Sequence, residues 1–190
     1  LPFILLLLIG FTSCKSSKLA TKNRKESIVK NHRSKKSKKV NNTSPEDIKA
    51  ESIVDFAQQF TGVRYKYGGT TKQGMDCSGL IQTSYKSESV VLPRTTNDLA
   101  KTGDWIDLKE VKKGDLVFFA TKKNSRKVNH VGIVTYADKD DVEFIHASSS
   151  KGVMTSRLKN RCWYFAFVQA RRVLWFLVSY NNAITQLYDY

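Results

Sequence analysis

The sequence predicts an α+β domain in which N-terminal helices pack on a C-terminal antiparallel sheet of about five strands. Two observations support this prediction. Apolar residues recur at helical spacing in the first half of the folded region, between residues 45 and 100. After Gly114 the period changes, and runs rich in β-branched and aromatic residues follow one another, separated by charged or turn-forming residues.

Composition and charge limit the classes of protein to which the chain can belong. Its 190 residues suffice for one ordinary domain with additional segments, and a hydrophobic content of 41% suits a packed core. The net charge is +15, but residues 15–44 carry 11 Lys and Arg against one acid, so the other residues carry only +5. Because the charge belongs to one segment, it does not indicate a nucleic-acid-binding domain.

The N-terminal residues have the pattern of an export signal. Residues 1–11 form an almost unbroken apolar run, shorter than the roughly 20 residues of a spanning helix but typical of a secretory signal. Small residues and Cys14 follow directly, and residues 1–14 together resemble a bacterial lipoprotein signal. The resemblance implies that Cys14 is lipidated and anchors the chain in the bacterial cell envelope, to the outer membrane facing the periplasm if the cell is Gram-negative. The alternative is an ordinary signal peptide with an incidental Cys14.

Residues 15–44 are expected to form a basic, disordered tether. They are rich in Lys, Ser and Asn and contain too few apolar residues to offset the entropy of ordering the chain. Their charge either attracts anionic lipid or cell-wall polymers, or the segment is a solvated spacer that lets the domain reach away from the membrane. Behind an export signal, nucleic acid is not expected as a partner.

The folded domain is expected over residues 45–174 and begins with a helix. Ser44 suits the N-cap, Pro45 suits the first helical position, and two acids follow in the first turn. Gly62 is expected to end the helix. Four apolar residues at i, i+3, i+4 and i+7 predict its buried face: Ile53, Phe56, Ala57 and Phe60.

A second helix is predicted to begin at or near Cys77. The glycine-rich residues 65–69 precede it, and Leu80, Ile81 and Tyr85 follow at helical spacing. Unpaired N–H groups and the positive end of the helix dipole favour a thiolate at such a position. On this segment alone, Cys77 is either a reactive nucleophile or a small buried side chain.

The strands are expected in the second half of the domain. Residues 92–96 before them are expected to be extended, followed by a short helix through Ala100. The predicted strands cover residues 115–119, 128–136, 142–147, 152–156 and 165–173.

Two of these strands carry histidines that a hairpin would bring together. His130 and His146 lie on consecutive strands, and the acid-rich residues 138–141 between them are typical of a turn. A hairpin centred on residue 138 or 139 makes the two histidines opposite or diagonal neighbours on one face of the sheet. Their Cβ atoms would then lie roughly 5–8 Å apart, so that one imidazole can orient the other.

A cysteine at a helix start and a pair of histidines predict nucleophilic catalysis at an acyl carbon. We expect Cys77 to attack, His130 to act as base and then as acid for the leaving amine, and His146 to orient His130. The N–H of Cys77 is a natural oxyanion donor. The three cysteines of the chain, which include Cys14 and Cys162, lack CxxC spacing and companion histidines at zinc spacing. We therefore expect no metal site and no cofactor.

Six motifs follow one another over about residues 46–173: Tyr65-x-x-Gly68-Gly69, Asp76-Cys77-Ser78-Gly79, Leu92-Pro93-Arg94-Thr95, Gly114-Asp115-Leu116-Val117-Phe118-Phe119, His130-Val131-Gly132-Ile133 and Ile145-His146-Ala147-Ser148. In this order they resemble the NlpC family of papain-like cell-wall cysteine peptidases. Behind a lipoprotein signal, such a domain is similar to the Spr-type lipoproteins.

The resemblance implies a papain-like fold and a catalytic triad of Cys77, His130 and His146. It implies a peptidoglycan endopeptidase that forms an acyl-enzyme and cleaves D-glutamyl–diamino acid bonds or D,D cross-links in the stem peptides. The stem peptides are then the partner, and we expect a monomer without a cofactor. The alternatives are a catalytically idle wall-binding lipoprotein and an amidase or acyltransferase that acts on another acyl substrate.

The resemblance also implies roles for side chains around the nucleophile. Tyr65 borders it and assists the oxyanion site, while Asp76, Ser78 and Arg94 line the substrate groove. Two simpler alternatives remain open at this point. Asp76 is a helix cap only, or Arg94 is a structural ion-pair partner only.

Two features depart from the family's pattern. Leu99 stands where a polar residue, usually Gln, is common, which concerns the groove rather than the triad. The family domain normally ends within a residue or two of Val173, so residues 175–190 form a C-terminal extension without an assigned role.

Overall fold

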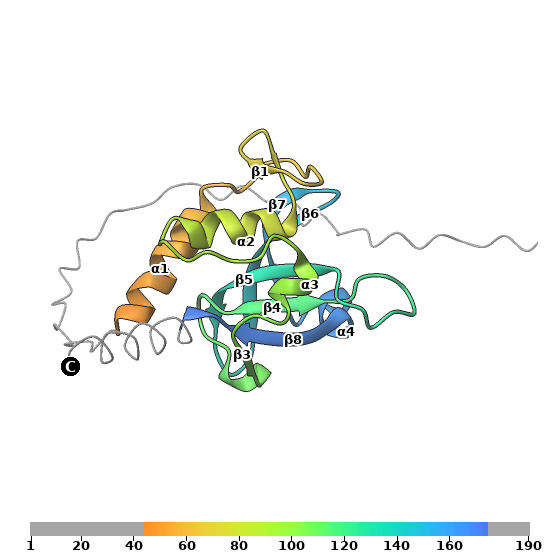
Figure 1. Ribbon diagram of the computed structural model, residues 1–190. Helices are drawn as coiled ribbons and strands as arrows, with labels where there is room; N and C mark the ends of the chain where they lie inside the picture. Colours follow the sequence, from red (N-terminus) through yellow and green to blue (C-terminus); the bar gives the residue numbers. More distant parts are fainter. Residues whose placement is uncertain (1–43, 175–190) are drawn as a thin grey trace, which may run out of the picture. The chain divides into compact units, whose positions relative to one another are not determined.

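The computed structural model describes residues 44–174, and these form the predicted α+β fold (Figure 1). The predicted lipoprotein signal with Cys14, most of the basic tether and the C-terminal extension lie outside the described residues. No helix within residues 44–174 combines the length and apolar character needed to cross a bilayer. In chain order the elements are α1 (Pro45–Gln58), β1 (Thr70–Thr71), β2 (Gly74–Met75), α2 (Cys77–Lys86), α3 (Thr96–Leu99), β3 (Asp104–Ile106), η1 (Leu108–Glu110), β4 (Leu116–Phe119), β5 (His130–Ala137), β6 (Val142–Ser148), β7 (Gly152–Arg157), α4 (Arg161–Ala166) and β8 (Phe167–Arg172).

The main sheet of the described region has six antiparallel strands in the order β3-β8-β4-β5-β6-β7, one more than predicted. The additional strand is β3, a three-residue edge strand paired with β8, and it is too short to show a period in the sequence. The helix α4 is also an addition. Its aromatic residues are enriched in strands, so the predicted strand began at residue 165, whereas β8 begins at Phe167.

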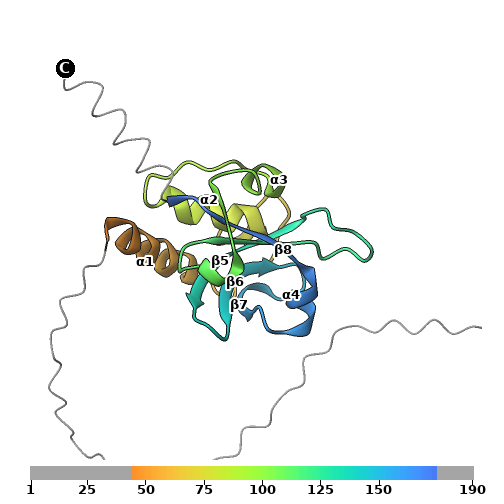
Figure 2. The ribbon, with the colours of Figure 1, turned by 90° about the horizontal axis from the view of Figure 1, so that it is seen from below.

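The sheet buries side chains on both faces, because successive residues of a strand point to opposite sides. On the face covered by α1 and α2, β4 contributes Leu116 and Phe118. On the other face it contributes Val117 and Phe119, which pack with Trp163 of α4. Figures 1 and 2 both place α4 beside the end of the sheet that lies away from α1.

The first helix begins as predicted, at a complete capping box. The Ser44 hydroxyl accepts a hydrogen bond from the Asp47 N–H at 3.2 Å, and the Asp47 carboxylate accepts one from the Ser44 N–H at 3.3 Å. The helix ends before Gly62, which adopts a φ of +85° in the following turn. Phe56 is only partly buried, and the rest of the predicted apolar face is buried: Ile53, Ala57 and Phe60.

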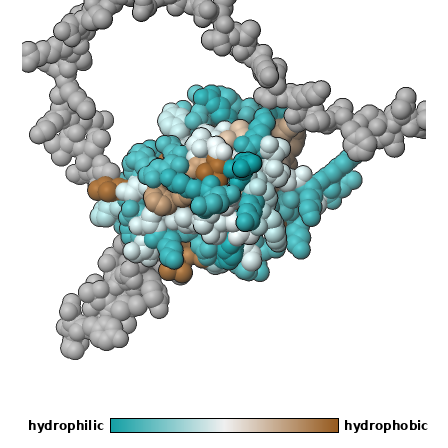
Figure 3. All heavy atoms as spheres, turned by 90° about the horizontal axis from the view of Figure 1, so that it is seen from above, coloured by the Kyte–Doolittle hydropathy of each residue, from teal (hydrophilic) through white to brown (hydrophobic). Residues whose placement is uncertain are grey.

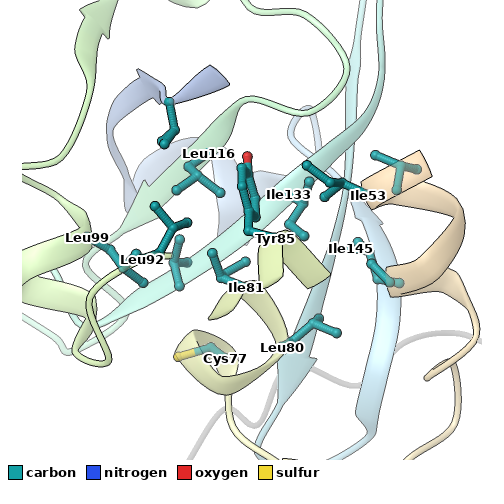
Figure 4. Close-up of a cluster of buried hydrophobic side chains, with 14 of the residues drawn as sticks. Ile53, Cys77, Leu80, Ile81, Tyr85, Leu92, Leu99, Leu116, Ile133 and Ile145 are labelled. Atoms are coloured by element: carbon teal, nitrogen blue, oxygen red, sulfur yellow. The ribbon is translucent and has the colours of Figure 1, made fainter. Parts of the chain in front are cut away.

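The second helix presents its apolar side to the core and its first residue to the edge of that core. Figure 4 shows Leu80, Ile81 and Tyr85 among the core side chains, with the Cys77 sulfur at the margin of the cluster. The Tyr85 hydroxyl is fully buried and donates a hydrogen bond to the Gly114 carbonyl, which ties α2 to the turn before β4.

A close backbone approach explains the glycine two residues after Cys77. A Cβ on Gly79 would lie 2.2 Å from the Gly69 carbonyl oxygen. The same oxygen accepts a hydrogen bond from the Asp76 N–H at 3.1 Å, so the glycine-rich loop and the start of α2 are held together. Only a residue without a side chain allows this contact.

Candidate active site

Cys77 is the first residue of α2, as predicted, with Asp76 at the N-cap. Its thiol lies 3.7 Å from the Thr96 hydroxyl, at the start of α3. The backbone N–H groups of Ser78 and Val131 are also directed at the sulfur. Since Val131 is the second residue of β5, the start of α2 and the start of β5 meet at the thiol.

The surroundings keep the Cys77 thiol protonated. Burial raises its pKa, the hydrogen bonds from Thr96 and two backbone N–H groups lower it in part, and the nearby Asp76 charge acts in the same direction as burial. The helix start alone favours a thiolate, but desolvation of the sulfur outweighs that effect. A base must therefore remove the thiol proton during the reaction.

The hairpin of β5 and β6 brings His130 and His146 together, which confirms the predicted neighbourhood. Nε2 of His130 lies 2.9 Å from Nδ1 of His146. The pairing of Ile133 with Ile145 places Gly132 opposite His146 and makes the two histidines diagonal neighbours. A register shift between Val134 and Tyr136 moves the turn slightly beyond its predicted centre.

The hydrogen-bond chain continues from His146 to Ser156 on β7. Nε2 of His146 lies 2.9 Å from the Ser156 hydroxyl, and His146 is almost completely buried. For Nδ1 of His130 to accept a proton, each imidazole must carry its hydrogen on Nε2. His130 then donates a hydrogen bond to His146, and His146 donates one to the Ser156 hydroxyl. The sequence pattern did not indicate Ser156, because only the pairing of Phe144 with Ser156 brings it diagonal to His146.

A tryptophan that the sequence pattern did not indicate covers the histidine pair. The Trp163 indole stacks on the His130 ring, with centroids 5.5 Å apart and an interplanar angle of 23°. It meets the His146 ring edge-on, with centroids 4.7 Å apart. Phe119 and Phe144 complete an apolar environment around the two imidazoles. No element was predicted for residues 157–164, so the sequence pattern gave no position for Trp163, which lies in α4.

This environment keeps both imidazoles neutral. His130 is half-buried as a residue, and burial lowers its pKa to about 4. Burial, together with the neighbouring His130, lowers the pKa of His146 to about 3. A neutral His130 retains a lone pair to accept the thiol proton even below its usual pKa of about 6.5.

Asp76 and Arg94 form a bidentate ion pair beside the nucleophile. Nη2 and Nη1 of Arg94 lie 2.8 and 3.0 Å from the two Asp76 oxygens, and Nη1 also donates to the Ser78 hydroxyl at 2.7 Å. Burial alone would raise the pKa of Asp76, but Arg94 and the N–H groups of Gly79 and Gly68 hold it below its usual value. Asp76 is thus both the helix cap and the partner of Arg94.

The thiol lies in a cavity of about 520 Å³. One wall comes from the glycine-rich loop, the start of α2 and residues 94–97, and the other comes from the β4–β5 loop. Burial raises the pKa of Tyr65, so its hydroxyl remains a hydrogen-bond donor. The side chains predicted to bind substrate all line this cavity: Tyr65, Asp76, Ser78 and Arg94.

Two further sequence features lie outside the cavity. Leu99 is fully buried in the core, so its departure from the family's pattern does not alter the groove. Cys162 is exposed on α4. Among residues 44–174, no three His, Cys, Asp or Glu side chains gather in a way that would hold a metal ion.

Comparisons with known proteins identify the fold and its relatives. The model of the NlpC/P60 family matches residues 62–172, which contain every site residue described above. The chain is 44% identical over 122 residues to the Escherichia coli K12 protein named "Probable endopeptidase NlpC", covering 64% of this chain and 76% of that protein. It is 36% identical over 129 residues to "Murein DD-endopeptidase MepS/Murein LD-carboxypeptidase" of the same strain, covering 67% of this chain and 64% of that protein.

A solved structure agrees with this family relationship. The crystal structure of an NlpC/P60 family protein from Bacillus cereus matches with a TM-score of 0.59 at 30% identity, covering 66% of this chain and 40% of that chain. The match thus spans less than two thirds of the MepS relative and less than half of the Bacillus cereus protein. On the family match over residues 62–172 and on the shared fold, the chain belongs to the NlpC/P60 family.

Proposed function

We propose that this protein is a peptidoglycan endopeptidase that cleaves amide bonds of stem peptides through a cysteine nucleophile. The observation that carries the proposal is the meeting of the Cys77 thiol with the start of β5, next to a His130 ring oriented by His146 at 2.9 Å. The Escherichia coli relatives, which are named as an endopeptidase and a murein DD-endopeptidase, support the substrate class.

In the first step, Nδ1 of His130 takes the thiol proton as the sulfur attacks the amide carbon. His146 accepts the Nε2–H of His130 and holds the ring in the tautomer whose Nδ1 is free to accept. The negative charge that develops on the carbonyl oxygen is stabilised by the Cys77 N–H and the Tyr65 hydroxyl. His130 then passes its proton to the leaving amine, the C–N bond breaks, and a thioester remains on Cys77.

In the second step, water attacks the thioester. His130 takes a proton from the water, the C–S bond breaks, and the sulfur recovers a proton as the peptide carboxylate leaves. Asp76, Ser78 and Arg94 hold the stem peptide in the cavity during both steps, since they present fixed hydrogen-bonding groups beside the thiol. The bond cut is the D-glutamyl–diamino acid bond or a D,D cross-link.

The protein acts in the bacterial cell envelope, where its substrate lies. The lipoprotein pattern at residues 1–14 supports anchoring through a lipid on Cys14, with residues 15–44 as a tether. A Cys14→Ser variant is expected to move from the membrane fraction to the soluble fraction. Retention of this variant in the membrane fraction would show that Cys14 does not anchor the protein.

The activity is tested with purified peptidoglycan and fragment analysis by mass spectrometry. The wild-type protein is expected to release new peptide ends, whose masses identify the bond, and Cys77→Ala is expected to release none above background. Cys162→Ala is the matched control, because it removes a thiol outside the cavity and should retain activity. Wild-type protein that binds peptidoglycan without releasing peptides would indicate a wall-binding protein instead.

A further inference from the structure

The β4–β5 loop, residues 120–129, brings a concentrated positive charge to the catalytic cavity. It contains four cationic residues and no acid: Lys122, Lys123, Arg126 and Lys127. Lys122 and Lys127 line the cavity that contains the Cys77 thiol. In Figure 3 the loop is the hydrophilic arm that projects to the right of the described region. Nothing in the proposed chemistry of Cys77 and the two histidines requires this charge.

Hydrogen bonds hold the loop closed at its base. The Asn129 side chain accepts from the Thr121 N–H at 2.8 Å, and its own amide donates to the Thr121 hydroxyl at 3.0 Å. Within the loop, the Lys127 N–H donates to the Ser125 hydroxyl at 3.1 Å. Lys122 directly follows Thr121, and Lys127 lies two residues before Asn129. Both lysines are therefore carried by the fixed part of the loop.

The opposite wall of the cavity does not neutralise these lysines. Asp76 is the one acid among the residues that line the cavity, and it is engaged in its bidentate pair with Arg94. Within the described residues, neither Lys122 nor Lys127 forms an ion pair. The cavity therefore carries two positive charges that no neighbouring carboxylate balances, and a bound anion would supply the missing partner.

We propose that Lys122 and Lys127 form a subsite for a free carboxylate of the substrate. This inference rests on the proposed function and narrows it to stem peptides whose carboxyl groups are not amidated. Such peptides carry carboxylates on the D-glutamyl residue, on the diamino acid and at the chain terminus, whereas amidation at any one of these positions removes one of them. The ammonium groups act as compact charges that favour the anion without fixing its geometry, so the subsite selects for charge.

The same loop provides a matched control. Lys123 lines a separate cavity of about 420 Å³ with Trp163 and Phe165, and Lys122 borders both cavities, whereas Lys127 borders only the one that contains Cys77. Lys123→Gln removes one positive charge from the loop, as Lys127→Gln does, but it does not change the lining of the catalytic cavity. Lys127→Gln and Lys123→Gln thus separate a local carboxylate contact from general attraction of an anionic substrate.

The test measures binding of synthetic stem peptides to a Cys77→Ala background and cleavage in the active protein. Four peptides are compared: one with free carboxylates, and three that are each amidated at one position, on the D-glutamyl residue, on the diamino acid or at the terminus. We expect the double variant Lys122→Gln/Lys127→Gln to bind the free peptide roughly threefold to tenfold more weakly than the parent. Lys127→Arg keeps the positive charge and should bind the free peptide as the parent does. One amidated peptide should bind the parent and the double variant equally, and its identity shows which carboxylate the subsite holds. Lys123→Gln should match the parent.

Each other result has a distinct meaning. The inference is wrong if the double variant binds all four peptides as the parent does, or if Lys123→Gln weakens binding as much as Lys127→Gln. The inference is also wrong if none of the peptides binds to the parent protein. If the peptides bind as expected but the active protein cleaves none of them, the proposed endopeptidase function fails while the carboxylate subsite stands.

Discussion

The indole of Trp163 lies nearly parallel to the imidazole of His130, with ring centroids 5.5 Å apart and an interplanar angle of 23°. The indole keeps water from one face of the proposed base, and burial is what lowers the pKa of His130 to about 4. We expect Trp163→Ala to raise this pKa towards about 6.5, so that the acid limb of the kcat/KM profile moves to higher pH. Cleavage of a stem peptide between pH 4 and 8 measures the shift.

Trp163→Phe is the conservative control for this prediction. A phenyl ring retains most of the cover over the imidazole, so the acid limb should stay close to that of the wild-type protein. If Trp163→Ala lowers activity equally at every pH, Trp163 supports the fold of α4 and does not tune the base.

Ser156 is expected to position His146, because its hydroxyl lies 2.9 Å from Nε2 of that ring. In Ser156→Ala the buried Nε2–H loses its partner, and kcat should fall roughly threefold to tenfold, as expected for one hydrogen bond of about 1 kcal/mol. Nitrogen NMR of the histidine side chains should show that the tautomer of His146 becomes mixed.

Ser156→Thr restores the hydroxyl and should restore both kcat and the tautomer. A Ser156→Ala protein with wild-type kcat and an unchanged nitrogen spectrum would mean that His146 is oriented by its packing alone.

The pairing of Asp76 with Arg94 predicts that Asp76→Asn impairs substrate binding. Asparagine can still cap α2 by accepting from the Gly79 N–H, but it removes the charge that holds Arg94 at 2.8 Å. We expect KM to rise roughly tenfold with little change in kcat, and Arg94→Ala to behave similarly. Steady-state kinetics on a stem peptide measure the effect. If Asp76→Asn has the KM of the wild-type protein, Asp76 caps α2 and has no role in substrate binding.

Stability should fall as the pH drops from about 6.5 towards 3, because the surroundings of His130 and His146 keep both imidazoles neutral in the folded protein. Their pKa values in the folded protein are about 4 and about 3, below the usual value of about 6.5 for an exposed histidine. In this range the unfolded chain binds more protons than the folded one, so protonation favours unfolding. The contribution is fully present above pH 6.5, and its loss is on the order of a few kcal/mol.

Urea unfolding at pH 7 and pH 5 measures this loss. The double variant His130→Gln/His146→Gln should show a smaller difference between the two pH values than the wild-type protein. An equal difference in both proteins would assign the acid sensitivity to other groups.

Gly79→Ala should destabilise the protein and disrupt the nucleophile together. The added Cβ would lie 2.2 Å from the Gly69 carbonyl oxygen, and backbone on both sides must move to accept it. We expect a loss of about 2 kcal/mol or more in the free energy of unfolding, as for other overpacked sites. Lys86→Ala, at the exposed end of the same helix, should change stability by less than about 0.5 kcal/mol. An active Gly79→Ala protein of wild-type stability would contradict the close approach.

Much of the site could be predicted because it depends on local signals. The turn residues between β5 and β6 and the two-residue period of strands place His130 and His146 on one face, and the observed register confirms this. The glycine-rich loop and the apolar spacing after Cys77 likewise predict that a helix begins there. By contrast, β3 and α4 are three and six residues long, and such short elements carry too little pattern to be distinguished from neighbouring segments.

The sequence by itself determined the α+β order, the starts of α1 and α2, and the pairing of the two histidines, because caps, turns and periodicity act between near neighbours. Only the tertiary structure decided that Trp163 covers His130, that the Ser156 hydroxyl forms a hydrogen bond with His146, and that the Cys77 thiol is protonated. These features depend on contacts between distant segments and on the removal of water from the side chains, and neither is encoded in the spacing of residues along the chain.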